Sequence, residues 1–144
     1  MVGYDLEEAI HLTDPGIAFT CARLHLRNGK RRLKKGLRTE GMIALYDSVL
    51  FGMRYYVTEH RQCVSVVENI DLWDAARLFQ ALAQAGVFDD PLTFNRFSLL
   101  VERALWQKTL SLESASVLAD AEKILRRLGV IPSNESTVGN GTSS

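Results

Sequence analysis

Apolar residues recur every three to four positions along most of this chain, and this spacing predicts helices rather than strands. No Asn-Gly or Asp-Gly turn separates two stretches of alternating apolar and polar residues, as a hairpin would require. The pattern therefore predicts an all-α protein, an up-and-down bundle of about five helices with short connections. The expected helices cover about 15–35, 39–59, 72–85, 91–107 and 111–128, and a further short helix fits 5–12.

Proline, glycine and polar capping residues set the expected ends of these helices. Pro15 and Pro91 fall in first turns and Pro132 follows the last helix, because proline is excluded from helix interiors. The Asn28-Gly29 pair predicts a weak point or kink in the first helix. The expected caps are Asp14, Thr39, Asp71 and Asp90, Ser111 begins the last helix, and Gly36, Gly86 and Gly129 end helices.

Each predicted helix has an apolar stripe that should face the core, and the helix over 39–59 is apolar on two faces, which is typical of a central helix. The residues expected to face inward are Ile17, Ala18, Cys21, Ala22 and Leu24 in the first helix; Met42, Leu45, Val49, Met53 and Tyr56, with Ile43, Tyr46 and Leu50 on a second face, in the second; Trp73, Ala76, Phe79, Leu82 and Ala83 in the third; Phe94, Phe97, Val101, Ala104 and Leu105 in the fourth; and Leu118, Ala121, Leu125 and Leu128 in the fifth.

Length and composition predict one domain over 1–132, followed by a polar tail over 133–144 that should be disordered. Cys21 and Cys63, together with the three histidines, show no metal-ligand spacing, so neither a metal nor a cofactor is expected. The two lone cysteines fit a reducing compartment. The N-terminus is acidic and does not resemble a signal peptide, and no apolar stretch is long enough to span a membrane. We therefore expect a cytoplasmic protein without membrane contact.

The charge of the chain is divided unevenly along its length. The net charge is zero, but the first predicted helix and the turn after it carry eight basic residues and no acidic residue. The rest of the chain has nine basic and 17 acidic residues, which leaves a net charge of −8 there. Such a division can steer a polyanion or an acidic partner toward one surface. The basic residues are Arg23, Arg27, Lys30, Arg31, Arg32, Lys34, Lys35 and Arg38.

Part of this basic block repeats at helical spacing, which places several cations on one face of the first helix. Such a row can neutralise phosphates without regard to base sequence. The alternative is a solvated face that acids on a neighbouring helix balance, with Glu113, Asp120 and Glu122 as candidates. The candidate residues for binding a polyanion are Arg23, Arg27, Lys30, Arg31, Lys34 and Lys35.

A second candidate site joins Arg54 to His60 near the end of the second predicted helix. His60 could act as an acid or base on a 2′-hydroxyl while Arg54 holds the phosphate, provided that the helix ends or bends near the histidine. The alternative is an arginine that extends toward solvent and a histidine that interacts with the helix C-terminal dipole.

Arg103, beside Glu102 on the fourth predicted helix, is a third candidate for polyanion binding. An arginine in a largely apolar helix needs compensation when it is half-buried. The alternative is therefore structural pairing, with Asp47 or Asp120 as the partner.

Several segments resemble HEPN-like domains: 21–23 and 37–54, then 78–89, 102–106, 112–115 and 121–125. The resemblance extends over about 15–128, and it implies a helical bundle that is often dimeric. It also implies a role beside a nucleotidyltransferase or as a metal-independent RNase. The chain departs from the RNase members because no histidine follows Arg103. It departs from the non-catalytic members because Leu105-Trp106 replaces an Asp-Tyr pair, so Arg103 alone is carried over.

These observations favour a binding module over an enzyme. We expect a homodimer, because the second and fourth helices carry more apolar surface than one short bundle covers. The module would bind RNA or a nucleotide through its basic first helix, or would accompany a nucleotidyltransferase. The alternatives are a metal-independent RNase that uses Arg54 and His60, and a structural helper that binds an acidic protein.

Overall fold

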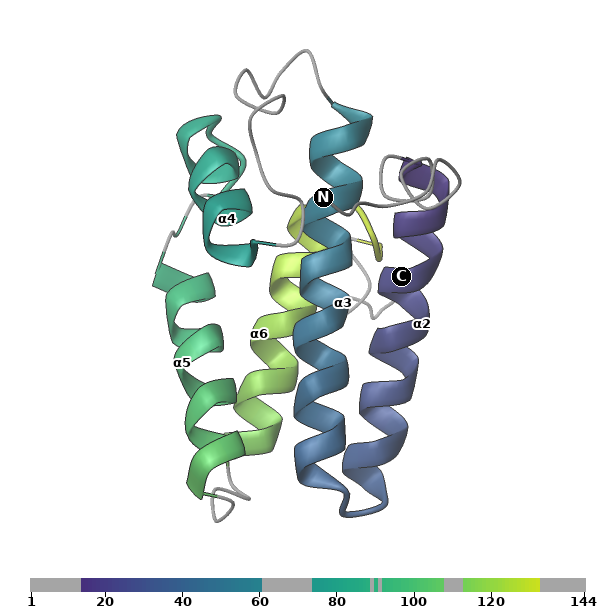
Figure 1. Cartoon of the computed structure of the whole chain (residues 1–144), viewed down its shortest axis with the longest axis vertical. Helices are drawn as coiled ribbons and strands as arrows, with labels where there is room; N and C mark the ends of the chain where they lie inside the picture. The colour runs from purple at the N-terminus through teal and green to yellow at the C-terminus, as the bar shows by residue number, and fades with distance from the viewer. Residues whose placement is uncertain (1–13, 61–73, 89, 91, 108–112, 133–144) are drawn as a thin grey trace, which may run out of the picture.

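The computed structural model describes residues 14–60, 74–88, 90, 92–107 and 113–132. Its helices are α2 (Pro15–Lys34), α3 (Arg38–Glu59), α4 (Ala75–Gln84), α5 (Leu92–Gln107) and α6 (Glu113–Arg127). The long helices α2, α3, α5 and α6 run alternately down and up, and the shorter α4 packs against α3 (Figure 1). Because the described residues contain no strand, the prediction of an all-α, up-and-down helical bundle is confirmed.

The predicted starts of α2 and α5 are confirmed, because an aspartate occupies the cap in each case. The Asp14 carboxylate accepts a hydrogen bond from the backbone N–H of Gly16 at 2.8 Å. The Asp90 carboxylate accepts one from the N–H of Leu92 at 3.0 Å, and the Thr93 hydroxyl donates to it at 3.1 Å. The predicted stops after α2, α4 and α6 are confirmed by positive φ angles of 81°, 78° and 82° at Gly36, Gly86 and Gly129.

Two of the predicted caps are wrong. Helix α3 begins at Arg38, with Leu37 as its cap and no capping side chain, so Thr39 lies inside the first turn. The short α2–α3 connection explains this start, because the Leu37 N–H already donates to the Arg32 carbonyl at 2.9 Å. Helix α4 is capped by Asp74, which accepts from the Arg77 N–H at 3.2 Å, so Asp71 is not its cap.

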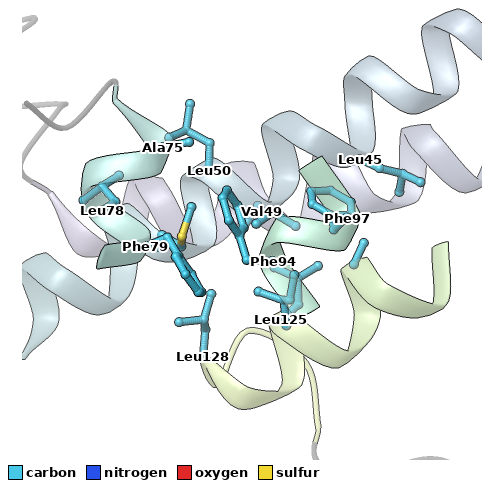
Figure 2. Close-up of a cluster of buried hydrophobic side chains, with 14 of the residues drawn as sticks. Leu45, Val49, Leu50, Ala75, Leu78, Phe79, Phe94, Phe97, Leu125 and Leu128 are labelled. Carbon is cyan, nitrogen blue, oxygen red and sulfur yellow. The ribbon is translucent and has the colours of Figure 1, made fainter. Parts of the chain in front are cut away.

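The core surrounds α3, as its two apolar faces predicted, but the inward assignment of Ile43 on the second face is wrong, because its side chain is 45% exposed. Met42, Leu45, Val49 and Met53 are completely buried, and α3 contacts each of α2, α4, α5 and α6. Figure 2 shows Leu45 and Val49 of α3 in one cluster with aromatic rings of α4 and α5 and leucines of α6. The same cluster contains Phe79, Phe94, Phe97, Leu125 and Leu128.

The predicted inward face of α2 is partly wrong. Ala18 and Ala22 are buried as expected, but Ile17 and Leu24 are exposed. Helix α2 instead approaches α3 through Gly29, where a Cβ atom would lie 2.8 Å from Leu45 Cδ2. The helix runs without a break through this glycine, so the predicted weak point is a place of close helix contact.

A smaller error concerns α4, in which Ala76 is exposed rather than inward. The buried side of this helix is formed by Ala75, Leu78, Phe79, Ala81 and Leu82. The predicted helix over 5–12, the predicted connector over 61–70 with Cys63, the inward Trp73, the start at Ser111 and the tail over 133–144 lie outside the described residues.

Candidate functional site

A groove lined by basic side chains lies between α2 and α6. Both helices pack on α3 but make little contact with each other, which leaves room between them. One hollow of about 590 Å³ has cations of α2 on one side and residues of the first turns of α6 on the other. An adjoining hollow of about 270 Å³ shares Arg27 and Lys30 with the first and also includes Arg23 and Glu122. We call the two hollows together the basic groove; its first part is lined by Arg27, Lys30, Arg31, Leu33, Lys34, Ser114, Ala115 and Leu118.

Part of the basic block is neutralised or used to hold the fold together. The Lys30 ammonium lies 2.9 Å from a Glu122 carboxylate oxygen, so Glu122 is one of the balancing acids that the alternative interpretation named. The Arg23 guanidinium donates a hydrogen bond to the Val130 carbonyl at 2.9 Å, which ties α2 to the segment after α6. Asp120 faces α5 and does not balance α2. The side chain of Glu113 lies outside the described part of the chain.

The remaining cations of the groove are directed to solvent. Arg27, Arg31 and Lys34 have exposed side chains and form no ion pair with any residue that the structure describes, and the same holds for Lys35 after the helix. Along a helix axis, positions 27 to 34 extend over about 10 Å. The arrangement therefore presents a short row of positive charge along one wall of the groove.

The end of α2 and the start of α6, which border this groove, contribute differently to its electrostatic field. The basic residues in the last turn of α2 offset the negative end of that helix dipole. Across the groove, Ser114 and Ala115 belong to the first turn of α6, where backbone N–H groups have no partner within the helix. This positive helix end adds to the field of the cations. Sequence reasoning missed the α6 wall because only the tertiary fold places the start of α6 opposite α2.

Arg54 and His60 occupy different surroundings. Arg54 is only 2% exposed, and its guanidinium carbon lies 4.6 Å from the centre of the Phe51 ring. His60 caps the end of α3, and its ring stacks on Tyr56 with 4.1 Å between ring centres. Six residues along a helix correspond to a rotation of about 240°, so the two side chains leave α3 in different directions. The use of this pair in catalysis stays a prediction.

Arg103 is exposed on α5 and is not part of the basic groove, which α2 and α6 form. Asp120, one of the partners that the sequence suggested for it, is bound instead by Arg96. That contact is bidentate, with 2.9 Å and 2.6 Å between guanidinium nitrogens and carboxylate oxygens. Hydrogen bonding to Asp120 raises the pKa of Arg96.

A second, mainly apolar hollow of about 400 Å³ lies between α3 and α5. It holds Asp47, the other suggested partner of Arg103, together with Glu102. Burial raises the pKa of the Asp47 carboxyl, and His25 lowers it by a smaller amount. Burial likewise raises the pKa of the neighbouring Tyr46 hydroxyl, with a further contribution from the charge of Asp74. We call this hollow the α3–α5 hollow.

No protein-family model, curated protein or solved structure matches this chain. The resemblance to HEPN-like domains therefore stays a prediction. None of the helices in the described part has both the length and the hydropathy to cross a membrane. Within the same residues, no three His, Cys, Asp or Glu side chains gather as a metal site would require.

Proposed function

We propose that this protein binds the phosphate backbone of a nucleic acid in the basic groove. The observation that supports this proposal is the row of Arg27, Arg31 and Lys34, three exposed cations on one wall of a groove whose other wall is a positive helix end. Measured along the duplex axis, one strand carries a charge every 3.4 Å or so, so a row of about 10 Å that lies along this axis spans roughly three phosphates of the strand. Cations held at this spacing would release counterions from several neighbouring phosphates at once.

The lining of the groove favours recognition of the backbone over recognition of bases. None of the described residues that line it is aromatic, whereas proteins that hold single strands without sequence preference stack bases on aromatic rings. Neither wall is a helix that projects a set of amide side chains, which read adenine edges. We therefore propose binding without sequence preference, in which a duplex is preferred over a single strand.

The nucleic-acid proposal is preferred to the RNase alternative because the arginine that catalysis would need is buried. A phosphate could not approach the Arg54 guanidinium without movement of the core around it. An acidic protein remains the other occupant that a positive groove can attract. Partnership with a nucleotidyltransferase stays a prediction that rests on the HEPN-like resemblance.

The test compares two double variants with the same change of charge. Arg31→Gln with Lys34→Gln removes two cations of the groove, whereas Arg77→Gln with Lys123→Gln removes two exposed cations outside it. Binding of a fluorescent duplex is followed by anisotropy at several salt concentrations. The groove variant should bind all sequences more weakly and should flatten the slope of log affinity against log salt by up to roughly 2, since about 0.9 is lost per phosphate contact.

The control variant should keep both the affinity and the slope of the wild type. Both variants should melt at the wild-type temperature, because exposed charges contribute little to stability. Wild-type protein that binds no duplex at low salt would contradict the proposal, as would equal losses in the two variants. The first of these results would leave an acidic protein as the partner to test next.

A further inference from the structure

The outer face of α5 carries an unusual line of large apolar side chains. Leu92, Leu99 and Trp106 are 70%, 58% and 80% exposed, so they contribute little to the core of their own chain. They are seven residues apart, and an α-helix returns to within about 20° of the same direction after seven residues. The three side chains therefore form one straight ridge along α5, which we call the α5 ridge.

The opposite side of α5 already supplies the core of the bundle. Phe94, Phe97 and Val101 are buried there, so α5 is apolar on two sides although it lies at the edge of the molecule (Figures 1 and 2). A seam between two helices uses two apolar positions in every seven residues, and the line from Leu92 to Trp106 supplies one of them, with charged or polar residues in between on the same face. Leu92, Leu99 and Trp106 are about 10 Å apart along α5 and lie in one line, which makes this face a candidate interaction surface.

The charges beside the ridge are divided by sign. With about 100° of rotation per residue, Arg96 and Arg103 lie about 60° and 40° to one side of Leu99. On that side the Arg96 guanidinium donates a hydrogen bond to the Asp120 carboxylate of α6. Asn95 and Glu102 lie by the same geometry about 40° and 60° to the other side, toward α3.

On the α3 side, Glu102 and Asp47 both line the α3–α5 hollow. Neither Arg96 nor Arg103 lines this hollow. The ridge therefore has a basic flank toward α6 and an acidic flank beside a hollow toward α3.

We propose that a second copy of this chain packs on the α5 ridge, with its α5 parallel to that of the first copy and a two-fold axis between them. A two-fold axis along the helices brings the basic flank of each copy to the acidic flank of the other. Each Arg103 then faces Glu102 of the second copy and the mouth of its α3–α5 hollow. Along the ridge, like residues meet: Leu92 with Leu92, Leu99 with Leu99 and Trp106 with Trp106.

The same surface does not suit an antiparallel pair. An antiparallel two-fold axis through Leu99 would bring like flanks together, so that Arg96 of one copy would lie against Arg103 of the other. Like charges that face each other across an interface cost energy and select against that arrangement. The division of charge therefore favours a second copy in the parallel orientation. This inference does not depend on nucleic-acid binding, because helices α5 and α2 lie at opposite sides of the bundle (Figure 1).

Sedimentation and light scattering test whether the dimer forms. At about 100 µM, a concentration that populates an interface with a micromolar Kd, the wild type should have twice the chain mass of 16.1 kDa. Leu99→Glu should be monomeric, because it places two carboxylates in the middle of the seam. The matched control is Leu24→Glu, which makes the same change at an exposed leucine of α2 and should remain dimeric. A monomeric wild type, or a dimer that survives Leu99→Glu with its circular dichroism unchanged, would overturn the proposal.

Charge exchange and cross-linking test the orientation. Glu102→Arg and Arg103→Glu should each raise the Kd of the dimer at least tenfold. The double variant with both substitutions should restore dimerisation. If either residue had only a structural role within its own chain, the double variant would not recover. In a chain with Cys21→Ser and Cys63→Ser, Leu92→Cys should form a disulfide-linked dimer by itself. If Leu92→Cys chains cross-link only when mixed with Trp106→Cys chains, the helices are antiparallel and the proposed interface is wrong.

Discussion

At the scale of single residues, Arg54 shows that position in the fold decides what a side chain can do. Its spacing from His60 suggests a catalytic pair in which His60 is the acid or base and Arg54 holds the phosphate. The fold of α3 instead buries Arg54 in the core and leaves His60 at the helix end. The Phe51 ring lies against the guanidinium, which keeps the cation in an environment with little water. The spacing of the two residues defines the angle between them on a helix, but it does not show which of them faces the core.

The structural role of Arg54 predicts unequal effects of two substitutions. Arg54→Ala should lower the free energy of unfolding by about 2 kcal/mol or more, because it removes a buried cation–π contact and the packing of a long side chain. His60→Ala should cost less than about 1 kcal/mol, as expected for a part-exposed residue at a helix end. Urea unfolding measures both values.

The opposite order of stabilities would show that Arg54 is not part of the core.

The RNase alternative can be tested with the wild type and the His60→Ala variant. RNA cleavage in EDTA by the wild type, lost in a folded His60→Ala variant, would support catalysis by this pair and would argue against the structural assignment.

At the scale of elements, the pair α2–α3 is held close by glycines. A Cβ atom at Gly29 would lie 2.8 Å from Leu45 Cδ2, and one at Gly41 would lie 2.6 Å from Leu33 Cδ2. A buried hydrogen bond from the Ser48 hydroxyl to the Ala22 carbonyl, at 2.6 Å, joins the same two helices. Glycine destabilises an isolated helix, but here it permits an approach that any side chain would prevent.

Gly29→Ala tests which of these two effects is larger. Helix propensity alone would stabilise the protein by about 1 kcal/mol. Because the new methyl group would displace the fully buried Leu45, we expect a net loss of about 1–3 kcal/mol instead. The control is Asn28→Ala, one position away, which should be neutral or slightly stabilising. A gain in melting temperature for Gly29→Ala would show that the helices can separate at little cost.

The elements also show which features of this fold are visible in the sequence. The caps at Asp14 and Asp90 and the glycine stops were predictable because these signals act within a few residues. The start of α3 at Arg38 was not, because the turn that follows α2 positions it without a capping side chain. The face of α2 that packs on α3 was predicted only in part. Ala18 and Ala22 were assigned to it correctly, but Ile17 and Leu24 are exposed, because the close approach of the helices at Gly29 sets which side of α2 is covered.

At the scale of the whole molecule, the basic segment of the sequence becomes one basic surface of the folded protein, along α2. Five of the eight residues of the basic block line a single groove, whereas Arg32, Lys35 and Arg38 do not. Of those five, Lys30 pairs with Glu122 and Arg23 binds the Val130 carbonyl, so both make contacts within the fold. Which cations remain exposed depends on α6, which is about ninety positions away in the chain. The inward side of α5 was predicted correctly, but the α5 ridge was not, because whether an apolar side chain outside that stripe stays exposed depends on which neighbouring helices cover it.

The distance between the basic groove and the α5 ridge predicts that the two surfaces work independently. At an ionic strength of about 0.1 M, charges more than roughly 10 Å apart are largely screened, so a carboxylate on the ridge should not disturb phosphates in the groove. Leu99→Glu should therefore bind a short duplex with the wild-type affinity per chain while it is monomeric. Conversely, Arg31→Gln with Lys34→Gln should lose affinity and remain dimeric. Anisotropy and sedimentation of the same two proteins measure both properties, and a folded Leu99→Glu variant that no longer binds duplex would show that the site requires both copies.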